Sequence, residues 1–452
     1  MNEMKKTLAL LLALLMALAV CGCAENLPQI EIPPIPEITA TPQPQMQTAE
    51  GEAAAQTGDQ TTETPLPTTE EVAAPTEESV VRVLVSNGKT EMSDFDPAEG
   101  EELILSFSYD MPRVYIENEP EVSSRINEAL ATVEETFYTG DMYEGDGHYL
   151  GYNAMLEAAE DNFSYVRDNN ASGMPLELSD ALTARVTRAD SAVLSVIYSE
   201  NCYLGGAHGS YGAEAYNFDL STGDRLTLDQ LSADGTLTDF LAERLLAMVE
   251  QNADGCADRI HEDFLPEGGL SEALRTLLRD GSWYFDGDGL VIFSDLEELG
   301  PYAAGMVEFH VPYADLEGKL DARWLFPGPR QGKGKLEVFE LSELEGGDTE
   351  IVDSLILNED GQELCIAANG RIYDVSVCSV YYVDRFYENT QFWYASSLSD
   401  CALQLQVVVP DGLPNLRISY TTADGVRHGK LLSQSGADGS FMLVDDDIQA
   451  VG

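Results

Sequence analysis

Residues 203–212 read YLGGAHGSYG and include His208, one of only five histidines in the chain. Histidine is the side chain most often used for proton transfer and for metal binding near neutral pH. The glycines at 205, 206 and 209 permit left-handed backbone and a close approach of neighbouring segments. The pattern therefore fits a catalytic loop, a metal site or a tight turn. We predict a turn between two strands that also faces a ligand. A loop with a purely structural role is the alternative interpretation.

Chemistry beyond binding finds little support around this loop. A zinc site needs two or three further ligands at helpful spacing, and His148, His261 and His310 do not provide it. A serine hydrolase of the G-x-S-x-G type would need that motif, and the sequence lacks it. Asp286 and Asp288 in FDGDGLVIF do not fit the twelve-residue calcium loop and predict a hairpin turn. We therefore expect no metal, no cofactor and no catalytic residue.

The charge of the chain narrows the choice of partners. Asp and Glu number 80 against 24 Lys and Arg, which gives a formal net charge of −56. Such a polyanion repels nucleic acid and anionic lipid, and it attracts cationic proteins or metal ions. A surface that is acidic only to remain soluble is the alternative interpretation.

The N-terminus predicts the location of the protein. MNEMKK followed by TLALLLALLMALAV has the charged start and the short apolar stretch of a secretory signal. Cys23 is preceded by Gly22, with aliphatic Val20 three positions before it, as in a bacterial lipoprotein signal, whereas Cys21 directly follows Val20. We expect a signal peptide at 1–22 and a lipid on Cys23 that holds the protein at the outer face of the membrane. An ordinary secretory signal is the alternative.

Residues 23–79 have the composition of a tether, being rich in Pro, Thr and Glu and poor in aromatic residues. The region after it predicts an α+β fold. Val122, Ile126, Leu130 and Val133 recur at helical spacing after Pro120. Further helices are expected from YNAMLEAAEDNFSYV and LTDFLAERLLAMVEQN, and strands from VVRVLVS, EELILSFSYDMPRVYI, LTARVTRADSAVLSVIYSENCYL and AEAYNFDL.

Residues 331–452 predict a separate, all-β domain of sandwich type. Short apolar runs such as RIYDVSVCSVYYV and LQLQVVVP alternate with turn signals such as NEDGQ and PDGLPN. The glycine-rich PGPRQGKGK precedes this block, so we expect residues 80–327 to fold without it. Disulfide pairing stays open because five cysteines follow Cys23, namely Cys202, Cys256, Cys365, Cys378 and Cys401. Buried free thiols are the alternative.

Four segments carry a resemblance to a known family: YLGGAHGSYGAEAYNFDLSTGDRLTLDQL, WYFDGDGLVIF, GPYAAG and VEFHVPYADL. In this order they resemble the extracytoplasmic domain of the lysozyme-sensing anti-sigma factors of the RsiV type. The preceding VYIENEPEVSSRINEAL resembles the companion domain found in the peptidoglycan deacetylase PdaC. The resemblance covers about residues 80–327 and implies α+β domains at 80–185 and 186–327. It also implies a ligand-binding role for Tyr203, Gly205, Gly206, His208 and Tyr302.

The departures from these families shape the functional expectation. The lipoprotein signal stands where the anti-sigma factors have a sigma-binding segment and a membrane helix, and the metal-binding motifs of the deacetylase are missing. We therefore expect a non-catalytic binding lipoprotein of the cell envelope that engages a lysozyme-like basic protein or a peptidoglycan fragment. The alternative is a peptidoglycan hydrolase or deacetylase with an unrecognised site. An acid–base or metal-ready pocket around His208 would favour that alternative.

Overall fold

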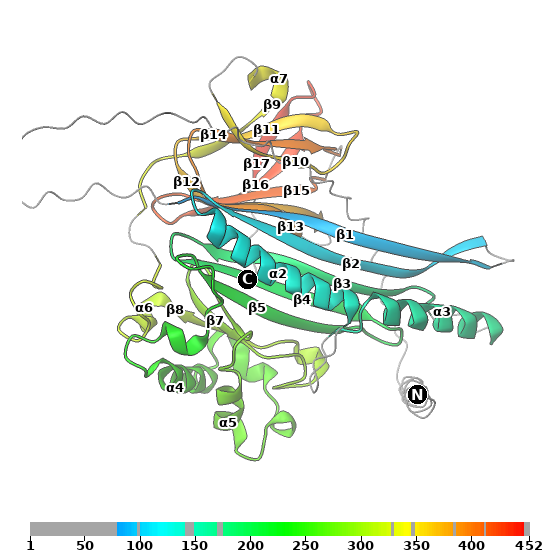
Figure 1. The fold of residues 1–452 in the computed structure, drawn as a ribbon, viewed down its shortest axis with the longest axis vertical. Helices are drawn as coiled ribbons and strands as arrows, with labels where there is room; N and C mark the ends of the chain where they lie inside the picture. The colour runs from blue at the N-terminus through cyan, green and yellow to red at the C-terminus, as the bar shows by residue number, and fades with distance from the viewer. Residues whose placement is uncertain are drawn as a thin grey trace, which may run out of the picture.

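The computed structural model describes residues 79–96, 100–140, 149–169, 175–326, 330–344, 349–382, 386–410 and 413–446. The expected signal peptide, Cys23, the tether and His148 lie outside the described residues. Within the described ranges the chain forms an α+β fold around three sheets, as the sequence predicts (Figure 1). None of the described helices has the length and apolar character that crossing a bilayer requires.

The largest sheet has ten strands and extends through most of the molecule. In spatial order these are β17 (Phe441–Asp445), β16 (Arg427–Gln434), β15 (Leu416–Thr421), β12 (Ile372–Tyr382), β13 (Phe386–Leu398), β1 (Val81–Asp96), β2 (Gly100–Ile116), β3 (Leu178–Ala189), β4 (Val193–Tyr203) and β5 (Ser210–Asp219). Only β2 and β3 pair in parallel, and the other neighbours in this sheet are antiparallel. The parallel pair requires a crossover, which is supplied by two helices.

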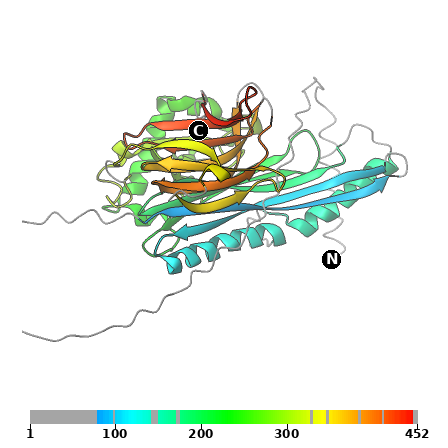
Figure 2. The same ribbon diagram turned by 90° about the horizontal axis from the view of Figure 1, so that it is seen from above.

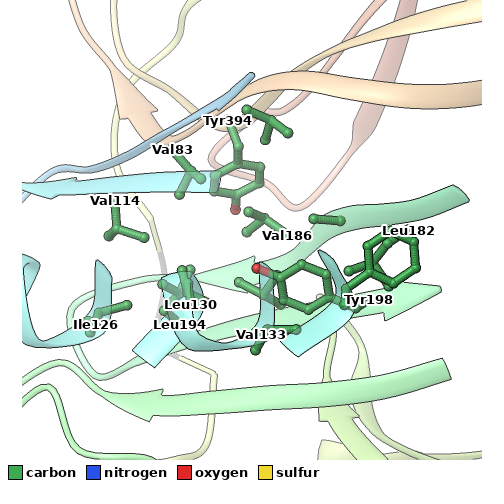
Figure 3. Close-up of a cluster of buried hydrophobic side chains, with 14 of the residues drawn as sticks. Val83, Val114, Ile126, Leu130, Val133, Leu182, Val186, Leu194, Tyr198 and Tyr394 are labelled. Carbon is green, nitrogen blue, oxygen red and sulfur yellow. The ribbon is translucent and has the colours of Figure 1, made fainter. Parts of the chain in front are cut away.

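Those two helices cover one face of the N-terminal strands. They are α2 (Pro120–Thr139) and α3 (Tyr152–Asp168), and they run along β1 and β2 in Figure 2. The expected apolar stripe of α2 is buried, and Pro120 occupies the start of the helix, where its missing N–H is not needed. Figure 3 shows the resulting core, with Ile126, Leu130 and Val133 of α2 facing strand residues of β1 to β4.

A second unit, formed by residues after β5, lies on the other face of β4. It contains α4 (Leu237–Glu250), α5 (Gly269–Thr276), α6 (Tyr313–Leu316), the three-stranded sheet β6 (Trp283–Phe285), β7 (Gly289–Phe293) and β8 (Glu308–Pro312), and the short 3₁₀ helices η1 (Leu228–Leu231), η2 (Ala253–Arg259), η3 (Glu262–Phe264) and η4 (Tyr302–Ala304). Val193 packs into the core of this unit, whereas its neighbour Leu194 packs beneath α2, because successive strand residues point to opposite faces. Buried Asn217 joins the layers through a 2.8 Å hydrogen bond from its side-chain amide to the Trp283 carbonyl oxygen.

Buried Arg188 fixes the second unit to the end of β3. Its side chain is only 2% exposed and forms an ion pair with buried Asp190. Its guanidinium also donates to the Tyr313 hydroxyl at 2.6 Å and to the Trp324 carbonyl oxygen at 2.8 Å. The ring of Phe285 lies 5.1 Å from the guanidinium carbon. The side chain of Arg188 on β3 therefore contacts β6 of the three-stranded sheet and the segment that follows α6.

The C-terminal block is a two-layer β structure, as expected, but one of its layers is not separate. The smaller layer is the sheet β10 (Glu350–Ile356), β14 (Cys401–Val407), β11 (Gln362–Asn369) and β9 (Lys335–Glu340), next to α7 (Leu341–Leu344). It packs against β12, β13 and β15, which belong to the ten-stranded sheet. β13 pairs directly with β1, with Val83 opposite Tyr394. The sheet is thus continuous between the first and the last thirds of the chain.

Side chains reinforce this continuity. Tyr394 of β13 enters the core beneath α2, beside Val83 and Val186 (Figure 3). The side-chain oxygen of Gln391 accepts the Val186 N–H at 2.8 Å. Residues 331–452 therefore complete the core of the N-terminal region. The boundary expected between 185 and 186 falls inside β3. Independent folding of 80–327 stays a prediction, and such a fragment would leave one edge of β1 without its partner strand.

All five cysteines after Cys23 are free and buried. This agrees with the alternative of buried thiols rather than with cross-linked strands.

Candidate ligand-binding site

The glycine-rich segment is the loop of the β4–β5 hairpin, which confirms the predicted turn. Cys202 pairs with Ser210 as the last register pair, so residues 203–209 form the loop. Gly205 and Gly206 have φ values of 89° and 96°, a backbone region that favours glycine. At Gly209 a Cβ atom would lie 2.7 Å from the Cys202 carbonyl oxygen, so a side chain is excluded there.

His208 and Tyr302 lie in contact, although 93 residues separate them in the sequence. Their rings stack with centroids 3.7 Å apart and an interplanar angle of 25°. His208 is exposed and Tyr302 half-buried, and η4 carries Tyr302 to the hairpin loop from the second unit. His208 Nδ1 lies 3.0 Å from the Gly209 carbonyl oxygen, to which it donates in the tautomer protonated at Nδ1. The structure therefore joins two of the residues that the family resemblance singled out.

Tyr203 supports the loop rather than the stack. Its hydroxyl donates to the Gly206 carbonyl oxygen at 3.1 Å, which spans the first part of the loop. The five predicted residues thus divide into two kinds. His208 and Tyr302 provide an accessible aromatic surface, while Tyr203, Gly205 and Gly206 hold the loop that presents it.

A group of acidic and thiol side chains lies where this loop begins. Asp180 on β3 is opposite Cys202 on β4, and Glu200 lies two residues before Cys202 on the same face. One ligand atom from each residue lies within 4.8 Å of the other two. Asp180 is fully buried and Cys202 is 8% exposed, and within the described ranges neither carboxylate oxygen of Asp180 has a partner with full hydrogen-bond geometry.

Burial disfavours the ionised forms of these side chains. It raises the pKa of Asp180 to about 8, with a further contribution from the charge of Glu200. Burial also raises the pKa of Glu200 to about 7 and that of the Cys202 thiol far above its ordinary range. Tyr149 lies near the same carboxylates, since burial and the charges of Glu214, Glu200 and Asp180 raise its pKa. No local sequence pattern indicates this group, because its members come from two strands and meet only through the register of those strands.

A histidine–carboxylate pair is another feature that the sequence patterns do not predict. His310 on β8 lies 3.1 Å from a carboxylate oxygen of Asp286 in the β6–β7 turn. The hydrogen bond to Asp286 raises the pKa of His310. Burial would raise the pKa of Asp286, but its hydrogen bonds with His310 and with the Asp288 N–H lower it overall. Asp286 also accepts the N–H of Gly289, which confirms the predicted hairpin turn at FDGDG.

Among the described residues the hairpin loop brings no nucleophile to His208. A triad-like centre needs a nucleophile within hydrogen-bond reach of the histidine. In the described ranges His208 has the Gly209 carbonyl oxygen as its only hydrogen-bond partner. The Asp180 group lies on the face covered by α2 and α3, and His208 is not among its members. The exposed chemistry of the site is therefore that of two stacked rings at the tip of a fixed hairpin.

The fold and the site together define an α+β protein with an exposed aromatic surface at a hairpin tip. Residues 229–314, from η1 to the start of α6, match the family model DUF3298, described as a protein of unknown function. The matched segment includes WYFDGDGLVIF, GPYAAG and most of VEFHVPYADL but not the hairpin loop. It supports a family relationship for this part of the chain without naming the anti-sigma factor or deacetylase relatives.

Two solved structures are similar to parts of the chain. One is a DUF3298 family member from Bacteroides fragilis NCTC 9343, with 18% identity over 53% of this chain and 94% of that chain, at a TM-score of 0.38. The other is a DUF3298 family protein from Pseudomonas aeruginosa PAO1, with 19% identity over 54% of this chain and 97% of that chain, at a TM-score of 0.33. None of the curated proteins matches the chain.

Proposed function

We propose that this chain is a non-catalytic binding protein of the bacterial cell envelope. A lipid on Cys23 holds it at the outer face of the membrane, and it binds a cationic protein of lysozyme type through the loop at 203–209 and Tyr302. The observation that carries the proposal is the stack of exposed His208 on half-buried Tyr302, at the tip of a hairpin whose turn uses glycines at positive φ.

The charge of the chain supports a cationic partner. A net charge of −56 raises the local concentration of basic proteins and speeds their encounter. The face of an aromatic ring attracts an Arg or Lys side chain, which gives the stack a role in recognition after encounter. The lysozyme class comes from the sequence resemblance, and its test is direct binding.

A peptidoglycan fragment is the second candidate, and the same stack favours it. Aromatic side chains offer a flat apolar face together with a polar edge, which suits the faces of sugar rings as well as cations. A neutral fragment would bind with little dependence on salt, because charge steering does not contribute to its encounter. Salt dependence therefore separates the two candidates.

Membrane anchoring is tested through the two N-terminal cysteines. Because Cys23 alone fits the lipoprotein signal, Cys23→Ala should abolish metabolic labelling with a fatty acid and release the protein from the membrane fraction. Cys21→Ala is the matched control and should retain both the label and the membrane association. A labelled Cys23→Ala protein together with an unlabelled Cys21→Ala protein would reverse the assignment.

Partner binding is tested by kinetics against lysozyme at increasing salt. Exposed charges are screened beyond about 8 Å at physiological ionic strength, so the association rate should fall as salt rises. The dissociation rate should stay nearly constant because contacts of the loop set it. His208→Ala should increase the dissociation rate several-fold. No binding to lysozyme even at low salt would remove the cationic partner and leave the peptidoglycan fragment to be tested with soluble muropeptides.

The structure offers a matched control for His208→Ala. His428 also stacks on a tyrosine, Tyr420, with centroids 4.9 Å apart, but it lies on β16 in the C-terminal block. His428→Ala removes the same kind of ring contact away from the hairpin loop and should leave the dissociation rate unchanged. Equal effects of the two substitutions, or no effect of His208→Ala in a folded protein, would return His208 to a structural role.

A further inference from the structure

The side chains at the base of the hairpin form a second feature that the proposed binding function does not use. Asp180 is fully buried, yet among the residues that the structure describes neither of its carboxylate oxygens has a partner with full hydrogen-bond geometry, and only the Ala181 N–H next to it lowers its pKa. Buried polar atoms are nearly always paired, so an orphaned carboxylate indicates a missing partner. Among the residues that the structure describes, no ion pair reaches Asp180 or Glu200, so a protein cation does not fill that role.

We propose that Asp180, Glu200 and Cys202 form a binding site for a divalent transition-metal cation, with Zn²⁺ as the best match. The donor set is two carboxylate oxygens and one sulfur, within 4.8 Å of one another. Zinc accepts Cys sulfur at about 2.3 Å and Asp or Glu oxygen at about 2.0–2.2 Å, so tetrahedral donors lie about 3.5 Å apart. A pair of donors at the 4.8 Å limit would need to close by about 1 Å, which side-chain rotation on fixed strands can supply.

The backbone already arranges these donors on one face. Asp180 and Cys202 are directly opposite in the antiparallel β3–β4 register, and Glu200 follows on the same face because side chains alternate along a strand. A site built on two paired strands is held more rigidly than one built on a loop. Three protein ligands leave the fourth tetrahedral position for water or another small donor.

The chemistry of the donors excludes the commoner hard cations. Calcium takes six to eight oxygen ligands, and magnesium prefers octahedral oxygen coordination. A thiol in a set of three donors instead selects a borderline or soft cation. The bound metal displaces the thiol proton, so two carboxylates and one thiolate face the divalent ion and the site keeps a net charge of −1. Since Asp180 and Cys202 are buried and lie on neighbouring strands, the ion would be enclosed at the base of the hairpin and would link β3 to β4 there.

The test uses the full chain, purified without a histidine tag and stripped with a chelator. Titration with Zn²⁺ against a chromophoric chelator should show one tight site per chain. Co²⁺ as a spectroscopic substitute should give the thiolate-to-metal charge-transfer absorption that only a sulfur ligand produces. Cys202→Ser should abolish this absorption. Asp180→Asn and Glu200→Gln should each weaken Zn²⁺ binding by more than about tenfold, since loss of a mere outer-shell partner already costs this much.

Cys365 provides the matched control. It is buried on β11, at 0% exposed against 8% for Cys202 on β4, and it belongs to no metal-capable group of the described residues. Cys365→Ser should therefore leave both Zn²⁺ affinity and the Co²⁺ absorption unchanged. A second measurement needs no variant: Zn²⁺ should slow alkylation of Cys202 in the native protein, as located by mass spectrometry, and leave the other four buried thiols unaffected.

Three outcomes would overturn the proposal. The first is the absence of a stoichiometric Zn²⁺ site in the stripped chain. The second is Zn²⁺ binding that survives Cys202→Ser, because it would then belong to surface carboxylates. The third is a metal-free Asp180→Asn protein that is more stable than the wild type, while Zn²⁺ stabilises neither protein. In that case the missing partner of Asp180 is a proton shared with Glu200. None of these outcomes depends on the partner of the hairpin loop, so the binding function is tested separately.

Discussion

Arg188→Met is expected to lower the free energy of unfolding by about 3–5 kcal/mol, as measured by urea denaturation. The substitution keeps most of the apolar stem but leaves the Asp190 carboxylate buried without its counter-charge. It also removes the hydrogen bonds to the Tyr313 hydroxyl and the Trp324 carbonyl oxygen. Because these bonds join β3 to the second unit, hydrogen exchange should increase first in the segment around Tyr313.

Two variants make this expectation specific. Arg188→Met combined with Asp190→Asn should recover part of the loss, because the Asn oxygen can still accept the N–H groups of Ala192 and Val193 that Asp190 binds now. Arg125→Met removes an exposed ion pair with Asp224 and should cost less than about 1 kcal/mol. A cost for Arg188→Met no larger than that for Arg125→Met would show that the buried pair does not hold the two units together.

The stability of the wild type relative to Asp110→Asn is expected to fall as pH rises. Asp110 is fully buried, and burial raises its pKa from the ordinary 3.8 to about 6, against hydrogen bonds from Asn87 and from the Ala184 N–H. A raised acid pKa means that the folded state binds more protons than the unfolded state between these values. The stability contribution of the protonated group is therefore present at low pH and is lost as pH rises through about 6.

The full effect corresponds to about 3 kcal/mol, from a shift of about two pKa units. The isoelectric point near 4.1 makes acid solutions unfavourable for solubility. Denaturation should therefore be compared between about pH 5 and pH 7.5, where about half of the effect, ~1.4 kcal/mol, is expressed. Asp286 differs in this respect, because its pKa is lowered and the stability that its ionised form contributes is lost only as pH falls below about 3.8, outside this range. A pH-independent difference for Asp110→Asn would contradict the assignment.

Local patterns in the sequence predicted the elements well where one periodicity dominated. The stripe Val122, Ile126, Leu130 gave α2, and alternation together with glycines gave the β4–β5 hairpin. Periodicity cannot identify which strands pair over long sequence separations. Only the structure shows that β1 pairs with β13, about 300 residues away. It also shows that several C-terminal strands belong to the ten-stranded sheet and do not form a sheet of their own. The boundary at 185 was placed inside a strand for the same reason.

The site shows a similar division. The family resemblance placed His208 and Tyr302 in one set, but their stacking depends on how η4 meets the hairpin, which no local pattern encodes. The sequence pattern around Arg188 predicts an ordinary strand with regular alternation. A register shift between Val186 and Arg188 changes the direction of its side chain, so it faces the second unit instead of the core beneath α2. Bulges of this kind break the alternation on which prediction relies.

The position of β1 has a mechanical consequence. The chain ahead of Val81 leads directly into a strand that lies inside the ten-stranded sheet, paired with β2 along its whole length and with β13 at Arg82 to Leu84. A force pulling on that end acts parallel to β1, so it shears the hydrogen bonds to both neighbours together. An edge strand pulled sideways would instead release its bonds one at a time. If the proposed anchor and the proposed ligand both hold the protein, tension between them would be borne by the hydrogen bonds on both sides of β1 at once.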